Sequence, residues 1–130
     1  MQTKQQLFKI EGFKGENPKE NKVFVNGIQL ENDPEGFTWD YHGGGPNRLS
    51  AAILSKFIPV NNRTVKEGRK KGIMSDEFDE LTKKFTAQKI RGWGYGDFMI
   101  HMDMKHWLRF HGNYKGPIIF QHLIAEEGKE

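Results

Sequence analysis

Apolar and polar residues alternate in the first part of the chain. Residues 7–13 alternate and predict a first strand. Residues 22–30 carry β-branched and aromatic side chains on both sides of an Asn26-Gly27 pair. Both central positions of a type I′ turn need a positive φ, which Asn and Gly tolerate. We therefore predict a tight hairpin over residues 22–30.

The apolar spacing becomes helical in the second part of the chain. It predicts a helix that opens at Pro46 and ends before Pro59, and a second from Ser75 to about residue 89. A strand over residues 97–102 and a short helix capped by Asp103 follow. The predicted core positions of the three helices are Leu49, Ala52, Ile53, Phe57, Met74, Phe78, Leu81, Phe85, Met104, Trp107 and Leu108.

Strands therefore gather early in the chain and helices late, which favours an α+β fold over a parallel βαβ sheet. We predict a small antiparallel sheet with an Asn-Gly hairpin packed against about three helices. Residues 1–130 are expected to form a single domain, which suits a chain of this length. The termini, residues 1–5 and 126–130, are expected to be flexible.

Composition narrows the classes of function. The chain has no cysteine, which excludes disulfides, thiolate metal sites and cysteine nucleophiles. No apolar run approaches the roughly 20 residues that span a bilayer, and no signal-peptide pattern is present, so we expect a cytoplasmic protein without a membrane partner. The net charge of +3 is a weak argument for nucleic acid. Basic residues nevertheless crowd residues 56–71, where they form either a solvated loop or a positive rim for a phosphorylated ligand.

The sharpest motif is the run from Phe37 to Arg48, in which Phe37, Trp39 and Tyr41 alternate along a predicted strand before Gly43-Gly44-Gly45-Pro46. Backbone N–H groups at a helix start lack internal partners and carry the positive end of the dipole. The motif therefore predicts either an anion site or only a tight turn. A Walker loop would continue Gly-Lys-Ser/Thr, so triphosphate hydrolysis is not expected.

Side chains around this turn complete a candidate ligand site. Asn47 or Arg48 would close over an anion, and Trp39, Tyr41 or Trp93 would offer a stacking surface for a base. For Trp93 and Tyr95, packing on the core is the favoured interpretation over stacking. The candidate ligand-binding residues are Trp39, Tyr41, His42, Gly43, Gly44, Gly45, Asn47, Arg48, Arg63, Arg69, Arg91 and Trp93.

Metal binding and catalysis find less support. His101, His106 and His111 are five residues apart, a spacing that does not share one α-helical face, and no His-Glu-x-x-His motif occurs. We predict no metal and no cofactor. Asp40 and His42 lie on one face of the predicted strand, but no nucleophile accompanies them, so we expect no catalytic residues and no enzyme. No nucleic-acid-binding motif appears either.

The run Phe37-Thr38-Trp39-Asp40-Tyr41-His42-Gly43-Gly44-Gly45-Pro46-Asn47-Arg48-Leu49 resembles a family of small uncharacterised proteins from phages and bacteria. Its members carry Phe-x-Trp-Gly-Tyr-Gly-Gly-Ser-Gly-Pro-Ala-Gln-Leu-Ala before a helix. The similarity extends weakly over about three-quarters of the chain. Asp40 and His42 stand where the family has glycines, and Asn47-Arg48 replaces Ala-Gln, which puts a positive charge at the helix start.

The phage association of this family implies a role in host takeover or in countering host defence. Together with the glycine turn it predicts a non-catalytic protein, expected to be a homo-oligomer, that sequesters a phosphorylated small molecule such as a cyclic nucleotide or an ADP-ribose-type immune signal. The alternative is a protein–protein inhibitor of a host defence complex. A small nucleic-acid-binding protein and a small hydrolase or transferase rank below both.

Overall fold

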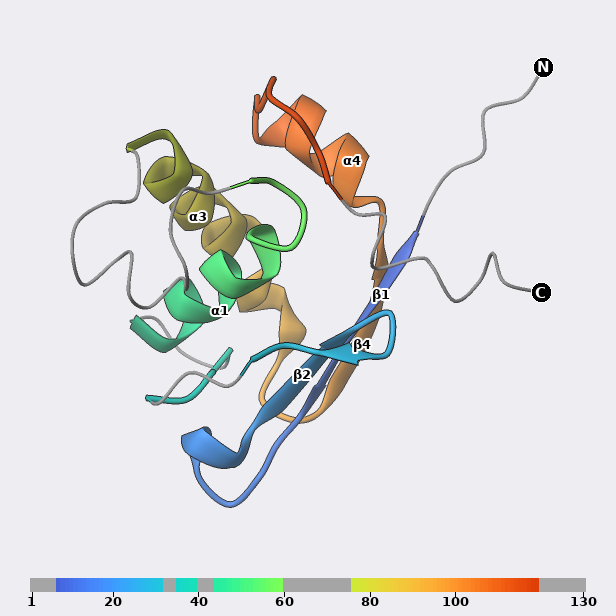
Figure 1. Cartoon of the computed structure of the whole chain (residues 1–130). Helices are drawn as coiled ribbons and strands as arrows, with labels where there is room; N and C mark the ends of the chain where they lie inside the picture. Colours follow the sequence, from blue (N-terminus) through green and yellow to red (C-terminus); the bar gives the residue numbers. More distant parts are fainter. Residues whose placement is uncertain (1–6, 32–34, 40–43, 60–75, 120–130) are drawn as a thin grey trace, which may run out of the picture.

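The computed structural model describes residues 7–31, 35–39, 44–59 and 76–119. These residues form one α+β domain in which a four-stranded antiparallel sheet is covered on one face by helices (Figure 1). The predicted fold class is therefore confirmed. No helix in the described ranges is long and apolar enough to cross a membrane.

The sheet has the strand order β3-β2-β1-β4, with β1 (Phe8–Phe13) and β2 (Lys22–Val25) at its centre and β3 (Ile28–Gln29) and β4 (Phe98–Met102) at its edges. A 3-10 turn, η1 (Pro18–Glu20), lies between β1 and β2. Asn26 and Gly27 join β2 to β3 with φ values of 51° and 81°. These positive values at both central positions confirm the predicted hairpin.

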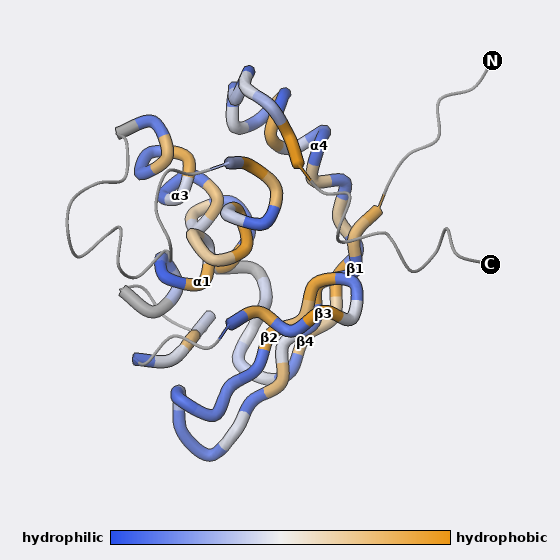
Figure 2. Tube along the Cα trace, in the orientation of Figure 1, coloured by the Kyte–Doolittle hydropathy of each residue, from blue (hydrophilic) through white to orange (hydrophobic). Residues whose placement is uncertain are grey.

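Two helices, α1 (Gly44–Leu54) and α3 (Asp76–Gln88), pack side by side over the inner face of the sheet (Figures 1 and 2). Aromatic rings fill the space between the layers. The Phe8 ring meets that of Phe57, just after α1, edge to face at 4.9 Å between ring centroids. Such pairs add to the stabilisation from burial. The predicted core positions Leu49, Ile53, Phe57, Phe78, Leu81, Phe85, Met104, Trp107 and Leu108 are all buried, Ala52 is partly buried, and Met74 lies outside the described residues.

The chain after α3 forms a 3-10 turn, η2 (Ile90–Trp93), the strand β4, and then α4 (Met104–His106), which continues as a π-helical turn, η3 (Trp107–His111). Asp103 caps α4 as predicted, because its carboxylate accepts a hydrogen bond of 2.9 Å from the His106 amide. In η3 the Gly112 amide donates to the Trp107 carbonyl at 2.8 Å, five residues back.

Two predictions about the glycine motif are wrong in detail. Residues 37–39 form no strand: Phe37, Thr38 and Trp39 are all buried, whereas a half-exposed strand would bury alternate residues. The Thr38 hydroxyl finds no hydrogen-bond partner in the described part of the chain. The helix also begins at Gly44, two residues before the expected Pro46.

Candidate functional site

The glycine turn merges into the first turn of α1. Because Gly44 and Gly45 are already helical, Pro46 is the third residue of the helix, where its missing N–H still costs no internal hydrogen bond. The first turn contains no acidic residue. The amides of Gly44 and Gly45 therefore lie at the positive end of the helix, the only part of the predicted anion site that the described backbone retains.

The Arg48 side chain is held by its own protein. Its Nε and one terminal nitrogen both donate to the Gly36 carbonyl at 3.3 Å, and the other terminal nitrogen lies 3.1 Å from the Glu35 carboxylate. Only 17% of the side chain is exposed. The guanidinium thus ties the chain before the motif to the start of α1, and Glu35 offsets the charge that an anion would need.

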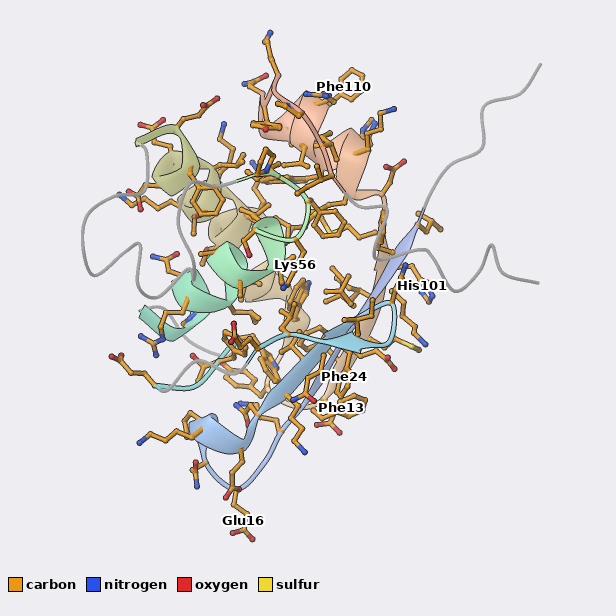
Figure 3. All side chains as sticks on the ribbon, in the orientation of Figure 1. Phe13, Glu16, Phe24, Lys56, His101 and Phe110 are labelled. Atoms are coloured by element: carbon orange, nitrogen blue, oxygen red, sulfur yellow. The ribbon has the colours of Figure 1, made fainter. Side chains whose placement is uncertain are left out.

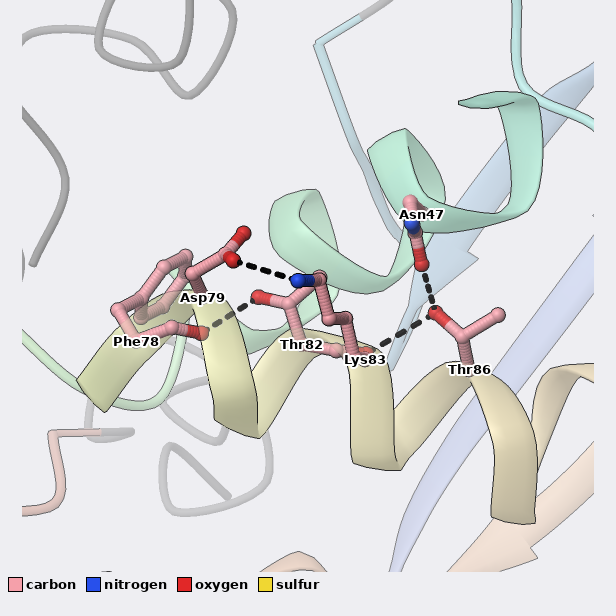
Figure 4. Close-up of polar contacts among 6 residues, drawn as sticks. All are labelled: Asn47, Phe78, Asp79, Thr82, Lys83 and Thr86. Atoms are coloured by element: carbon pink, nitrogen blue, oxygen red, sulfur yellow. Dashed lines mark hydrogen bonds and ion pairs between the residues drawn. The ribbon is translucent and has the colours of Figure 1, made fainter. Parts of the chain in front are cut away.

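Asn47 also has a structural partner. Its Oδ1 accepts a hydrogen bond of 2.7 Å from the Thr86 hydroxyl of α3 (Figure 4). The same Thr86 hydroxyl lies 2.6 Å from the Ser50 hydroxyl. In the same helix the Thr82 hydroxyl donates to the Phe78 carbonyl at 2.9 Å. Asn47 therefore links the start of α1 to α3.

The prediction that Trp39 offers a stacking surface is wrong. The ring is 1% exposed, meets Phe98 edge to face at 4.9 Å, and donates from Nε1 to the Gly96 carbonyl at 2.9 Å. The Lys14 ammonium lies 5.0 Å from its ring centroid. A ring enclosed in this way leaves no face for a base.

Trp93 is half-buried, and its ring centroid lies 4.3 Å from that of Phe98, so its ring packs on the core as the sequence favoured. The side chains of the remaining candidates lie outside the described structure. Arg91 belongs to η2, but its side chain lies outside the described structure. The candidates that fall entirely outside the described residues are Tyr41, His42, Gly43, Arg63 and Arg69.

The geometric argument against a shared histidine face is wrong for one pair. The His106 and His111 rings lie 5.7 Å apart, since a π-helical turn brings residues five apart onto one face. The exposed Phe110 ring lies 4.6 Å from that of His106. Within the described ranges no three His, Cys, Asp or Glu side chains gather as a metal site would require.

A second surface was not among the predicted sites. Side chains at alternate positions of the four strands lie on the sheet face opposite α1 and α3, and we call these residues the open face; Phe13, Phe24 and His101 are labelled in Figure 3. Phe13 and Phe24 meet there edge to face at 5.7 Å, with Phe13 42% exposed, and Met99 is 58% exposed. The other residues of the open face are Lys9, Glu11, Lys22, Gln29 and His101. The alternation in residues 7–13 contained this information, because Phe13 falls on the polar side of β1.

Comparisons with protein-family models, with curated proteins and with solved structures find no match for the chain. The resemblance to the phage and bacterial family therefore stays a prediction from one motif.

Proposed function

We propose that the chain is a non-catalytic binding protein that docks the open face of its sheet against a partner protein. The observation that carries this proposal is the pair of the exposed Phe13 and the half-buried Phe24, together with the exposed Met99, on a sheet face that no described helix covers. A sheet face turned to solvent ordinarily carries polar side chains. Aromatic residues and methionine are enriched at protein interfaces, where their burial is favourable and methionine adapts its shape.

Charge on the open face favours an acidic partner. The Lys9 ammonium lies 3.6 Å from the Glu11 carboxylate, so the one acidic side chain of the open face is paired. Lys22 adds a positive charge to this face, and His101 adds an imidazole. A partner surface with an apolar centre and an acidic rim would complement this arrangement and be drawn to it at low ionic strength.

The resemblance to phage proteins suggests the biological class of that partner, a host defence complex. The protein–protein inhibitor that the sequence offered as its alternative now fits the described surfaces better than small-molecule sequestration. Two of the side chains expected to hold the ligand, Asn47 and Arg48, bind their own chain, and Trp39 is enclosed.

The test compares Phe13→Ser with a matched control, Phe110→Ser. Both remove one exposed phenyl ring, but Phe110 is 70% exposed on η3 and lies off the open face. Phage plaque counts are measured in cells that carry a nucleic-acid-guided defence complex and express each variant. We expect the wild type and Phe110→Ser to relieve defence and Phe13→Ser to lose that effect. Equal relief by both variants would overturn the proposal.

Sequestration of a phosphorylated small molecule is the second candidate, favoured by the acid-free first turn of α1 with its two glycine amides. It is tested with a panel of cyclic nucleotides and ADP-ribose, following the Gly44 and Gly45 amide resonances. Glu35→Gln removes the carboxylate that offsets Arg48 and should strengthen binding, whereas Asp79→Gln, in the first turn of α3, should not. Unchanged resonances in all three proteins would exclude this candidate.

A further inference from the structure

The outer edge of β4 carries backbone groups that are not paired with any described residue. In β1, the Lys9 amide donates to Asn26 Oδ1 and the Asn26 amide donates to the Lys9 carbonyl, both at 2.8 Å. The odd-numbered residues of β1 thus direct their backbone groups toward β2. The backbone N–H and C=O groups of successive residues point to opposite edges of a strand, so the even-numbered residues of β1 bond to β4.

The register carries this alternation onto β4. Gly12, Ile10 and Phe8 stand opposite Phe98, Ile100 and Met102, which therefore direct their backbone groups toward β1. The N–H and C=O groups of Met99 and His101 consequently point away from the sheet. The described residues supply no partner for them.

Little in β4 discourages pairing with another strand. Edge strands are commonly protected by proline, by lysine or by an inward-pointing charge. The sequence Phe98-Met99-Ile100-His101-Met102 contains none of these, and its nearest charged residues are Asp97 and Asp103 at its two ends. Such an edge is open to strand addition.

The positions of Asp97 and His101 favour a second copy of the same chain as the added strand, and they favour one pairing register. Two β4 strands can pair antiparallel about a twofold axis with Met99 opposite the partner's Met99. Asp97 then stands opposite the partner's His101, and the reciprocal pair forms by symmetry. Asp97 is exposed, and one of its carboxylate oxygens is engaged by the Lys14 amide, so the other can meet the imidazole.

The neighbouring registers lose the Asp97–His101 pair. Moving the axis to Ile100 places Asp97 opposite the partner's Asp103, and moving it to His101 places two copies of His101 opposite each other. Moving it to Phe98 places Asp97 opposite the partner's Met99, which offers no charge. Opposite charges across an antiparallel pair are favourable and like charges are not.

We propose that two copies of the chain associate through β4 in the Met99-centred register, so that their sheets become continuous. The interface is short, because β4 has only five residues. It falls below the area of a standard stable complex, so the dimer fraction should rise with concentration. This inference does not depend on the proposed docking function.

The test compares Met99→Pro with Met99→Ala by analytical ultracentrifugation over a concentration series. Proline removes the N–H that points to the open edge and breaks no hydrogen bond to β1, although it also fixes φ at this position. Alanine keeps the N–H and removes the same side chain. The twofold axis doubles each loss, so Met99→Pro should weaken dimerisation by about 10- to 100-fold more than Met99→Ala. Equal dissociation constants would overturn the proposal.

A second pair of variants tests the register without proline. His101→Asp places a carboxylate opposite the partner's Asp97 and should abolish the dimer, while His101→Asn should retain most of it. Hydrogen exchange adds an independent measure: the Met99 and His101 amides should be protected in the dimer and exchange quickly in His101→Asp, with Ile100 protected in both. A wild type that stays monomeric at millimolar concentration overturns the proposal and leaves the edge for an extended peptide.

Discussion

Replacing Arg48 by Met separates a structural role from a ligand-binding role at the glycine motif. The structure predicts that this variant loses stability in the absence of any ligand, because the guanidinium joins Gly36 and Glu35 to α1. Methionine keeps much of the aliphatic volume of the arginine stem, so the loss reports mainly on the polar contacts.

The magnitude follows from the two kinds of contact. Hydrogen bonds from a charged donor contribute about 1.5–3 kcal/mol, and Arg48 directs two nitrogens to one carbonyl. The Glu35 carboxylate is 65% exposed, so its pairing adds at most about 1 kcal/mol. We expect Arg48→Met to lower the free energy of unfolding by about 2–3 kcal/mol and Glu35→Gln by about 0.5 kcal/mol.

The assay is urea unfolding followed by tryptophan fluorescence, with the double variant completing a cycle that isolates the Arg48–Glu35 coupling. A coupling of about 0.2–1 kcal/mol is expected for so exposed a partner. If Arg48→Met unfolds within about 0.5 kcal/mol of the wild type, as surface substitutions usually do, the structural role assigned to Arg48 is refuted. Arg48 would then return to the list of side chains available to a ligand.

Three further predictions concern the core and its periphery. Trp39→Phe removes the Nε1–H that bonds to the Gly96 carbonyl and should cost about 2–4 kcal/mol in urea unfolding; a cost under about 1 kcal/mol would show that the ring is not enclosed. Gly12→Ala should cost about 1–3 kcal/mol and shift the ring resonances of Phe98, because an added Cβ would stand 2.1 Å from that ring. Burial raises the pKa of Tyr114 above its ordinary value of 10.0. The stabilisation from the neutral Tyr114 hydroxyl is therefore complete below pH 10 and is lost as the pH rises through the raised pKa of the folded state. Above pH 10 the melting temperature of Tyr114→Phe should fall less than that of the wild type. Melting temperatures that fall in parallel for the two proteins would contradict the burial of Tyr114.

The sequence predicted correctly the turn and the helix cap that depend only on neighbouring residues. The Asn26-Gly27 turn needs only the φ preferences of two residues, and Asp103 needs only amides within its own turn. Both predictions are confirmed. The strand predicted over the glycine motif failed because alternation says nothing about what lies above and below a segment. Residues 37–39 are buried on both sides, and this burial cannot be predicted from the residues next to them in the sequence.

The candidate site was harder to predict for the same reason. Arg48 looks available in the sequence, since its partners Glu35 and Gly36 precede it by more than ten residues across a turn. The π-helical turn that joins His106 to His111 has no simple sequence pattern either. Phe13, by contrast, could have been found, because an aromatic residue on the polar side of an alternating strand is the kind of exception that marks a surface.

The two proposals reinforce each other physically but fail separately. Pairing through β4 would place two open faces on one continuous sheet, and a partner with two copies of the same epitope would then bind with avidity. Phe13 lies on β1, away from the β4 edge, so Phe13→Ser should lose inhibition while the protein still sediments as a dimer. His101→Asp should lose the dimer, and because His101 also lies on the open face, the added carboxylate should weaken binding of an acidic partner as well. A Phe13→Ser protein that neither dimerises nor inhibits would show instead that the open face itself holds the two copies together.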